Sequence, residues 1–106
     1  MGKMDKVFEE SKQYLNGEEV ISWIPASFEN KNGVLVATTK QVVFYGKKLF
    51  GYNLESIPYS KISSVDVNKN MNLYYLKIFT SGNEISIMSI DKKAVEFAQD
   101  IKNKIA

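Results

Sequence analysis

The stretch 46–51 holds the side chains best suited to a binding contact. It reads Gly-Lys-Lys-Leu-Phe-Gly, so two cations stand beside two apolar groups between glycines. Such a turn could touch an anionic bilayer, where each lysine contributes about 1 kcal/mol, or the surface of a protein. In the alternative arrangement, the two apolar side chains fold back over the end of the domain and only the lysines face water. The predicted contact residues are Lys47, Lys48, Leu49 and Phe50, with Lys31 and Lys40 as lesser candidates.

Residue types on which much catalysis depends are missing from this chain. Its 106 residues include no Cys, no His and no Arg, so all 14 basic residues are lysines. A thiolate nucleophile, the usual zinc ligands and the commonest general base are therefore absent. The serines at 60, 63 and 64 have no histidine to activate them. We predict that the chain is not an enzyme and that it holds no metal and no cofactor.

Charge is unevenly distributed along the chain, although the net charge is only +2. Residues 1–29 carry three lysines against six acidic residues, whereas residues 30–83 carry seven lysines against two. An anionic partner for the basic region is one interpretation. The alternatives are that the acidic N-terminal segment packs near the basic region, or that the lysines are simply solvated.

Nucleic acid is a second anionic partner to consider. Tyrosines at 45, 52, 74 and 75 lie among the lysines, in a pattern that superficially suits stacking on single strands. The isoelectric point near 8.7 is low for such a function, and arginine is absent. We predict no nucleic-acid partner and find no sign of a small-molecule substrate.

Periodicity predicts a helix at each end of the chain with strands between them. An apolar stripe of period 3.6 runs over residues 4–15 and ends at Asn16-Gly17, and a second follows Asp91, a predicted N-cap. Pro25 predicts a bend, a bulge or an edge in the first strand. The apolar runs 34–38 and 41–45 fit a sheet with one buried face. The predicted strands are 18–29, 34–38, 41–45, 52–58, 62–68, 73–80 and 84–90.

These elements predict an α+β domain. Seven short antiparallel strands would form a barrel or sandwich, and the C-terminal helix would close its open end or seam. The first helix has an apolar stripe with no assigned partner. It could pack on its own barrel or on another copy of the chain, and self-association could also use an exposed strand edge.

Several stretches resemble the bacterial PH domain family, in particular its small YokE-like and SHOCT-associated members, which are related in layout to GRAM domains. They are Gly17–Val20, Gly33–Tyr45, Ile57–Val65, the Leu76–Ile78 strand and the Ser81–Gly82 hairpin. The resemblance spans roughly residues 17 to 105. It implies a PH-like barrel over 17–106, with 1–16 as an additional amphipathic helix.

PH-like domains bind lipid headgroups, peptides or proteins, or act as scaffolds. Members that bind phosphoinositides use several basic residues, whereas the matching turn here offers only Lys31 with Glu29 beside it. We therefore predict a non-catalytic binding or scaffold module that engages a protein partner or self-associates. The alternative is weak electrostatic binding to anionic membrane lipid through the 46–51 turn.

The chain contains no apolar run near the ~18 residues that a membrane-spanning helix needs. Its first residues do not have the pattern of a signal peptide, because acidic residues follow where an apolar region would stand. We expect a cytoplasmic location, peripheral at the inner face of the membrane if lipid is the partner.

Overall fold

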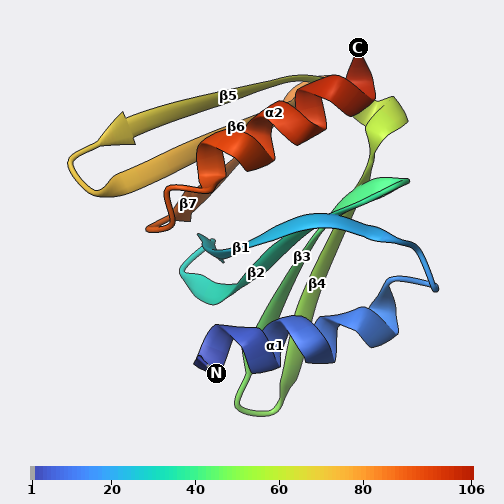
Figure 1. The fold of residues 1–106 in the computed structure, drawn as a ribbon, viewed down its shortest axis with the longest axis vertical. Coiled ribbons are helices and arrows are strands. Elements are labelled where there is room, and N and C mark those ends of the chain that lie inside the picture. The colour runs from blue at the N-terminus through green and yellow to red at the C-terminus, as the bar shows by residue number, and fades with distance from the viewer. Residues whose placement is uncertain (1) are drawn as a thin grey trace.

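Seven strands and two α-helices make up the computed structural model, which describes residues 2–106 (Figure 1). The elements are α1 (Lys3–Ser11), a 3-10 turn (Lys12–Tyr14), β1 (Val20–Phe28), β2 (Lys31–Thr38), β3 (Gln41–Lys48), β4 (Gly51–Pro58), a 3-10 turn (Tyr59–Lys61), β5 (Ile62–Asn70), β6 (Leu73–Thr80), β7 (Asn83–Ser89) and α2 (Ala94–Ile105). The strands follow the order β4-β3-β2-β1-β7-β6-β5, and every pair is antiparallel. The predicted α+β class, with about seven antiparallel strands and a C-terminal helix, is confirmed.

A narrow seam divides the sheet into two halves, β1–β4 and β5–β7. β1 pairs with β2 along its length but meets β7 only at Ser27 and Met88. Pro25, which has no N–H to give to a ladder, lies beside this seam, and its carbonyl accepts a 2.6 Å hydrogen bond from Ser89 Oγ. The pairing of β1 with β2 nevertheless stays regular at Pro25, which lies opposite Val34, and the register shift of this strand lies between Val20 and Ser22. The irregularity predicted at Pro25 is therefore wrong for this pairing, because the proline turns its missing N–H away from β2.

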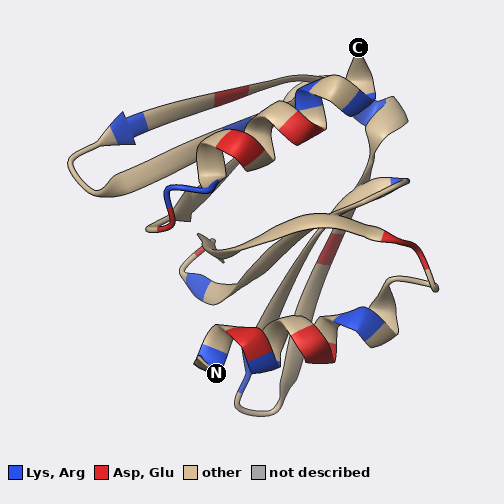
Figure 2. Cartoon of the chain, viewed as in Figure 1, with Lys and Arg blue, Asp and Glu red and all other residues tan. Residues whose placement is uncertain are grey.

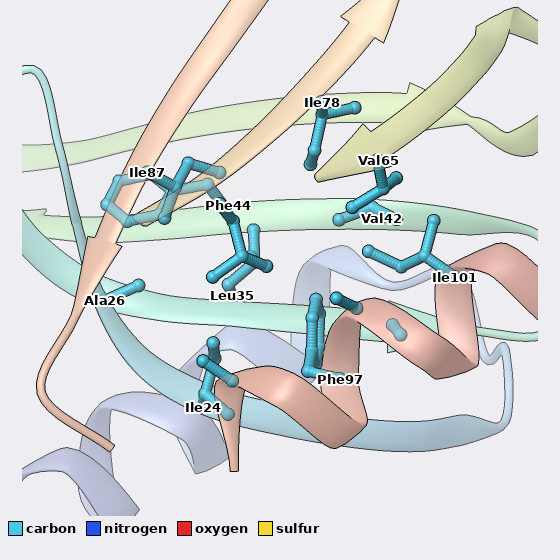
Figure 3. Close-up of a cluster of buried hydrophobic side chains, with 14 of the residues drawn as sticks. Ile24, Ala26, Leu35, Val42, Phe44, Val65, Ile78, Ile87, Phe97 and Ile101 are labelled. Atoms are coloured by element: carbon cyan, nitrogen blue, oxygen red, sulfur yellow. The ribbon is translucent and has the colours of Figure 1, made fainter. Parts of the chain in front are cut away.

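The main core fills the space between the two halves and α2 (Figure 3). Phe97 and Ile101 of α2 are completely buried, as are Ile24 of β1 and Ile78 of β6. The buried members are Ile24, Ala26, Leu35, Ala37, Val42, Phe44, Ile57, Ile62, Val65, Leu76, Ile78, Ile87, Ala94, Phe97, Ala98 and Ile101. The apolar stripe of the second helix thus closes the barrel, as its periodicity predicted.

A second cluster lies on the opposite face of β2 and β3, beneath α1. Figure 1 shows α1 on the side of the β1–β4 half that faces away from α2. Side chains of β2 alternate between the two clusters. Leu35 and Ala37 belong to the main core, and Val34 and Val36 belong to the cluster beneath α1. Both faces of these strands are buried, so the prediction of one buried face is wrong. The physical reason is α1, which packs on its own barrel through Val7 and its neighbours.

Three local features differ from the sequence-based expectations. The first hairpin turns at Glu29 and Asn30, both with positive φ (51° and 65°), instead of over residues 30–33. The connection predicted for 46–51 narrows to two residues because β3 and β4 extend into it. The Asp91 carboxylate accepts a hydrogen bond from the Lys93 N–H, but a tight turn intervenes and the α-helix begins at Ala94.

The division of the chain into 1–16 and 17–106 stays a prediction. Residue 1 lies outside the described residues, and Leu15, near the proposed boundary, is 1% exposed within the second cluster. A boundary at this place would cut through packed side chains.

Candidate functional site

The β3–β4 hairpin carries two large apolar side chains into solvent. Lys48 and Gly51 are directly opposite one another in the ladder, which leaves Leu49 and Phe50 as the turn. Leu49 is 89% exposed and Phe50 is 92% exposed, so the alternative in which they fold back over the domain is wrong. Gly51 has φ +126°, a conformation that suits glycine and fixes the turn. We call Leu49 and Phe50 the hairpin tip.

The two lysines before the tip have different surroundings. Lys47 Nζ donates hydrogen bonds to both carboxylate oxygens of Glu10, at 3.1 and 2.9 Å. This hydrogen bond and the charge of Glu10 raise the pKa of Lys47 above its usual value. Among residues 2–106, no carboxylate lies within ion-pair distance of Lys48. Figure 2 shows the acidic residues of α1 beside the basic end of β3, so the acidic segment does pack near basic residues here.

The two lesser candidates lie at opposite ends of β2. Lys31 begins β2 at the end of the sheet that carries the hairpin tip, because β2 and β3 are antiparallel. Lys40 lies in the turn between β2 and β3, roughly 20–25 Å away along the strands. The structure therefore brings Lys31 to the same end as Lys47 and Lys48, and it does not bring Lys40 there.

The model of a family described as "Bacterial PH domain" matches residues 15–104. The chain belongs to the bacterial PH domain family. The resemblance predicted from the sequence is thereby confirmed, although the family match does not identify a ligand or a partner. No curated protein matches this PH domain.

Solved structures agree with the fold of this PH domain. A C-terminal domain of an unknown protein from Leishmania infantum superimposes with a TM-score of 0.72 at 17% identity, covering 97% of this chain and 98% of that one. A DUF1696 family protein with a pleckstrin-homology domain from Shewanella loihica has a TM-score of 0.64 at 18% identity, with complete coverage of both chains. At these identities the likeness concerns the fold alone.

Three tyrosines support the base of the hairpin in this PH domain. Tyr14 lies 5.4 Å from Tyr45 and 4.5 Å from Tyr52 between ring centroids. Burial raises the pKa of Tyr14 and of Tyr45. Tyr45 and Tyr52 therefore pack against other rings, instead of forming a free stacking platform for bases. The sequence did not predict the role of Tyr14 or of Glu10, because nothing in the local pattern links them to the hairpin.

A small polar cavity of about 80 Å³ lies beside the same end of the domain. Its lining comes from the first hairpin and from β4: Phe28, Glu29, Lys31, Asn53, Leu54 and Glu55. Asn53 Nδ2 is buried and has no hydrogen-bond partner among residues 2–106, which is uncommon for a buried donor. Asn53 was not among the predicted site residues, because an asparagine in a predicted strand carries no distinctive signal.

The described residues contain neither a cluster of metal ligands nor a helix that could span a membrane. Within residues 2–106, no group of three or more His, Cys, Asp or Glu side chains is arranged to hold a metal ion. Neither α1 nor α2 has the length and apolar character needed to cross a bilayer.

Proposed function

We propose that the chain is a non-catalytic binding module that engages a protein partner through the hairpin tip. The observation that carries the proposal is the exposure of Leu49 and Phe50, 89% and 92%, at the end of a well-supported hairpin. Large aromatic side chains presented on rigid elements are typical anchors of protein interfaces. Because the turn is held by two strands, little flexibility would be lost on binding.

The charge beside the hairpin tip favours a protein partner over a lipid partner. Lys47 is already matched by Glu10, so the hairpin offers Lys48 as its one lysine outside an ion pair. One lysine contributes about 1 kcal/mol at an anionic surface, and stable membrane attachment generally combines two stronger signals. The nearby Lys31 is flanked in sequence by Glu29, so it adds little net positive charge. Weak binding to anionic lipid is therefore the second candidate.

Family membership agrees with an interaction module but does not select the partner. PH-like folds carry many different binding functions, and the ligand must be inferred from the site. The missing His and Cys residues also favour binding over catalysis.

The test compares a tip variant with a matched control on another turn. The Leu49→Ser, Phe50→Ser double variant removes the anchor, and Met71→Ser alters the β5–β6 turn, where Met71 is 85% exposed. Tagged forms are cross-linked inside cells of the source organism, and the captured proteins are quantified by mass spectrometry. We expect a partner that the unaltered chain and Met71→Ser both enrich, and that the double variant loses at least tenfold.

Equal capture by the double variant and by the unaltered chain would overturn the proposed contact. Co-sedimentation with vesicles tests the second candidate directly, with neutral and anionic vesicles at low and moderate salt. Pelleting with anionic vesicles that persists at moderate salt and requires the tip would replace the protein partner with lipid.

A further inference from the structure

We propose that two copies of the chain pair through the free edge of β4, so that one antiparallel sheet continues across a two-fold axis. This pairing uses the side of β4 that no strand within residues 2–106 occupies. It does not depend on the hairpin tip as a contact for another protein, and it goes beyond the function proposed above.

The two edges of the sheet differ in how they are protected. β5 has a register shift between Ile62 and Ser64, carries Asp66 and Lys69, and packs against α2. Bulges, charges and covering helices are the usual devices that prevent edge strands from pairing. β4 is regular in register with β3 over all its eight residues, and its one charged side chain is Glu55. β4 is therefore the edge open to another strand.

The hairpin fixes which backbone groups of β4 face outward. Lys48 and Gly51 flank the two-residue turn and are directly opposite one another, so they exchange hydrogen bonds. Hydrogen-bonded pairs alternate along an antiparallel ladder, so the odd-numbered residues of β4 bond to β3. The 3.4 Å bond from the Tyr59 N–H to the Lys40 carbonyl continues this alternation. The residues whose N–H and C=O groups face outward are Tyr52, Leu54 and Ser56.

These outward groups select one register for two identical strands. With the two-fold axis at Leu54, that residue bonds to its own copy and Tyr52 bonds to Ser56 of the second copy, so the outward groups of these three residues all find partners. An axis at Asn53 leaves Ser56 opposite the turn of the second copy. An axis at Glu55 sets two like charges directly opposite, which is unfavourable. The register centred on Leu54 is therefore the one that β4 favours.

The same register supplies a hydrogen-bond partner for the side-chain amide of Asn53. Asn53 stands directly opposite Glu55 of the second copy, in a pair whose backbone groups bond to β3. Side chains of such pairs approach most closely across a ladder. Once its side chain turns toward the outer edge, Asn53 Nδ2, which is buried without a partner within residues 2–106, can donate to the carboxylate of Glu55 of the second copy. The two-fold axis makes this contact twice.

The outer face of β4 agrees with burial against a second copy. Tyr52 is 45% exposed and Leu54 is 38% exposed, although both are large apolar residues of a strand. The axis at Leu54 brings the two Leu54 side chains together. A strand of unrelated sequence could satisfy the backbone, but a second copy also provides the carboxylate for Asn53 and the matching leucine. These three features together identify the occupant as this same chain.

Light scattering and cross-linking test the pairing on the complete chain. We expect a species of twice the 12.1 kDa monomer mass that populates further as the concentration rises. The chain has no native cysteine, so a Leu54→Cys variant can be treated with a short bismaleimide linker. It should cross-link efficiently, whereas Val95→Cys, at an exposed position of α2, should not. A monomer at all concentrations, together with no excess cross-linking at residue 54, would overturn the proposal.

A rescue experiment tests the register separately from overall folding. Asn53→Asp sets two carboxylates opposite one another and should weaken the dimer at least tenfold. Adding Glu55→Asn restores an amide opposite a carboxylate only in the Leu54-centred register, so it should restore dimerisation. If the double variant stays monomeric while its circular dichroism matches that of the unaltered chain, the register is wrong.

Lysine substitutions on the edge strands test the pairing through β4 separately from the proposed contact at the hairpin tip. Leu54→Lys should give a monomer, while Ser64→Lys on the opposite edge should leave the dimer intact. The tip double variant should still dimerise, and Leu54→Lys should still capture the partner of the hairpin tip. Dimerisation that withstands Leu54→Lys would contradict pairing through β4, whatever the result at the tip.

Discussion

Lys47 Nζ lies 2.9 Å from Glu10 Oε2 and joins the N-terminal helix to the end of β3. The two residues are 37 positions apart in the sequence. This contact has two consequences. It ties α1 to the hairpin that presents the exposed apolar pair, and it neutralises one of the two lysines on which binding to an anionic surface would depend.

Glu10→Gln should therefore increase binding to anionic vesicles. The change removes a negative charge and releases Lys47, so we expect about a fivefold gain at low salt, corresponding to about 1 kcal/mol for one lysine. Stability should change little, because exposed ion pairs contribute about 0–1 kcal/mol. Co-sedimentation measures the gain, and Glu9→Gln serves as the control. Where the unaltered chain pellets at low salt, equal pelleting of Glu10→Gln would contradict the neutralisation of Lys47 by Glu10.

Phe8→Ala should loosen α1 from the barrel. Phe8 stacks on Trp23 with ring centroids 4.7 Å apart and an interplanar angle of 6°. Removing a half-buried ring should cost about 1–3 kcal/mol. Trp23 is the only tryptophan in the chain, so its fluorescence should shift to the red and report urea unfolding. Glu9→Ala is the control. An unchanged spectrum and midpoint for Phe8→Ala would argue against the packed helix.

Thr38→Val should destabilise the β2–β3 turn by about 1–3 kcal/mol, because it leaves buried polar groups without partners. Thr38 is fully buried. Its Oγ1 donates to Glu18 Oε1 at 2.7 Å and accepts from the backbone N–H groups of Lys40 and Gln41 at 3.1 and 3.0 Å. Thr39→Val, at the exposed neighbouring position, is the control. Urea unfolding of both variants tests the difference, and equal midpoints would refute it.

Alkaline pH should destabilise the fold through Tyr59. Its hydroxyl donates a 2.7 Å hydrogen bond to the Thr38 carbonyl, and burial raises its pKa to about 12 from an ordinary value of 10.0. A pKa that is higher in the folded state gives stability that is complete below pH 10 and is lost as pH rises from 10 towards 12. Unfolding measured across this range should depend less steeply on pH for Tyr59→Phe. An equally steep pH dependence of the free energy of unfolding for the unaltered chain and for Tyr59→Phe would contradict this prediction.

Gly33→Ala should be among the most damaging changes of a single methyl group. A Cβ at this position would overlap the backbone of Tyr45 and Gly46 on the neighbouring strand. Because backbone atoms move less readily than side chains, we expect a loss of about 2–3 kcal/mol or failure to fold. Gly2→Ala, where a Cβ finds ordinary contacts, is the control. Thermal unfolding compares the two, and a Gly33→Ala midpoint equal to that of the control would contradict the close approach.

Much of the fold could be predicted from local patterns. The clean alternation of residues 73–80 and the helical stripe after Asp91 identified β6 and α2, since each has one buried face. The double burial of β2 and β3 was missed, although their unbroken apolar runs are typical of strands covered on both sides. The first helix also had an apolar stripe without an assigned partner, which indicated a helix available to cover the second face of these strands. Considered together, the two observations would have placed α1 on β2 and β3.

The candidate site was only partly predictable for a different reason. The composition of residues 46–51 indicated a binding contact at this hairpin. The exposure of Phe50, however, depends on the turn having only two residues, and that length is set by how far β3 and β4 extend toward each other. The pairing of Lys47 with Glu10 and the isolation of Asn53 Nδ2 arise between segments far apart in sequence. Periodicity carries no information about such contacts.

The coverage of β2 and β3 on both faces has a consequence for how the molecule opens. Their backbone amides are shielded by one hydrophobic cluster on each side and lie inside the ladder. Detachment of α1 alone leaves the main core intact, and detachment of α2 alone leaves the outer cluster intact. Deuterium should therefore reach these amides last, through global unfolding, while the edge amides of β4 exchange much earlier in the monomer.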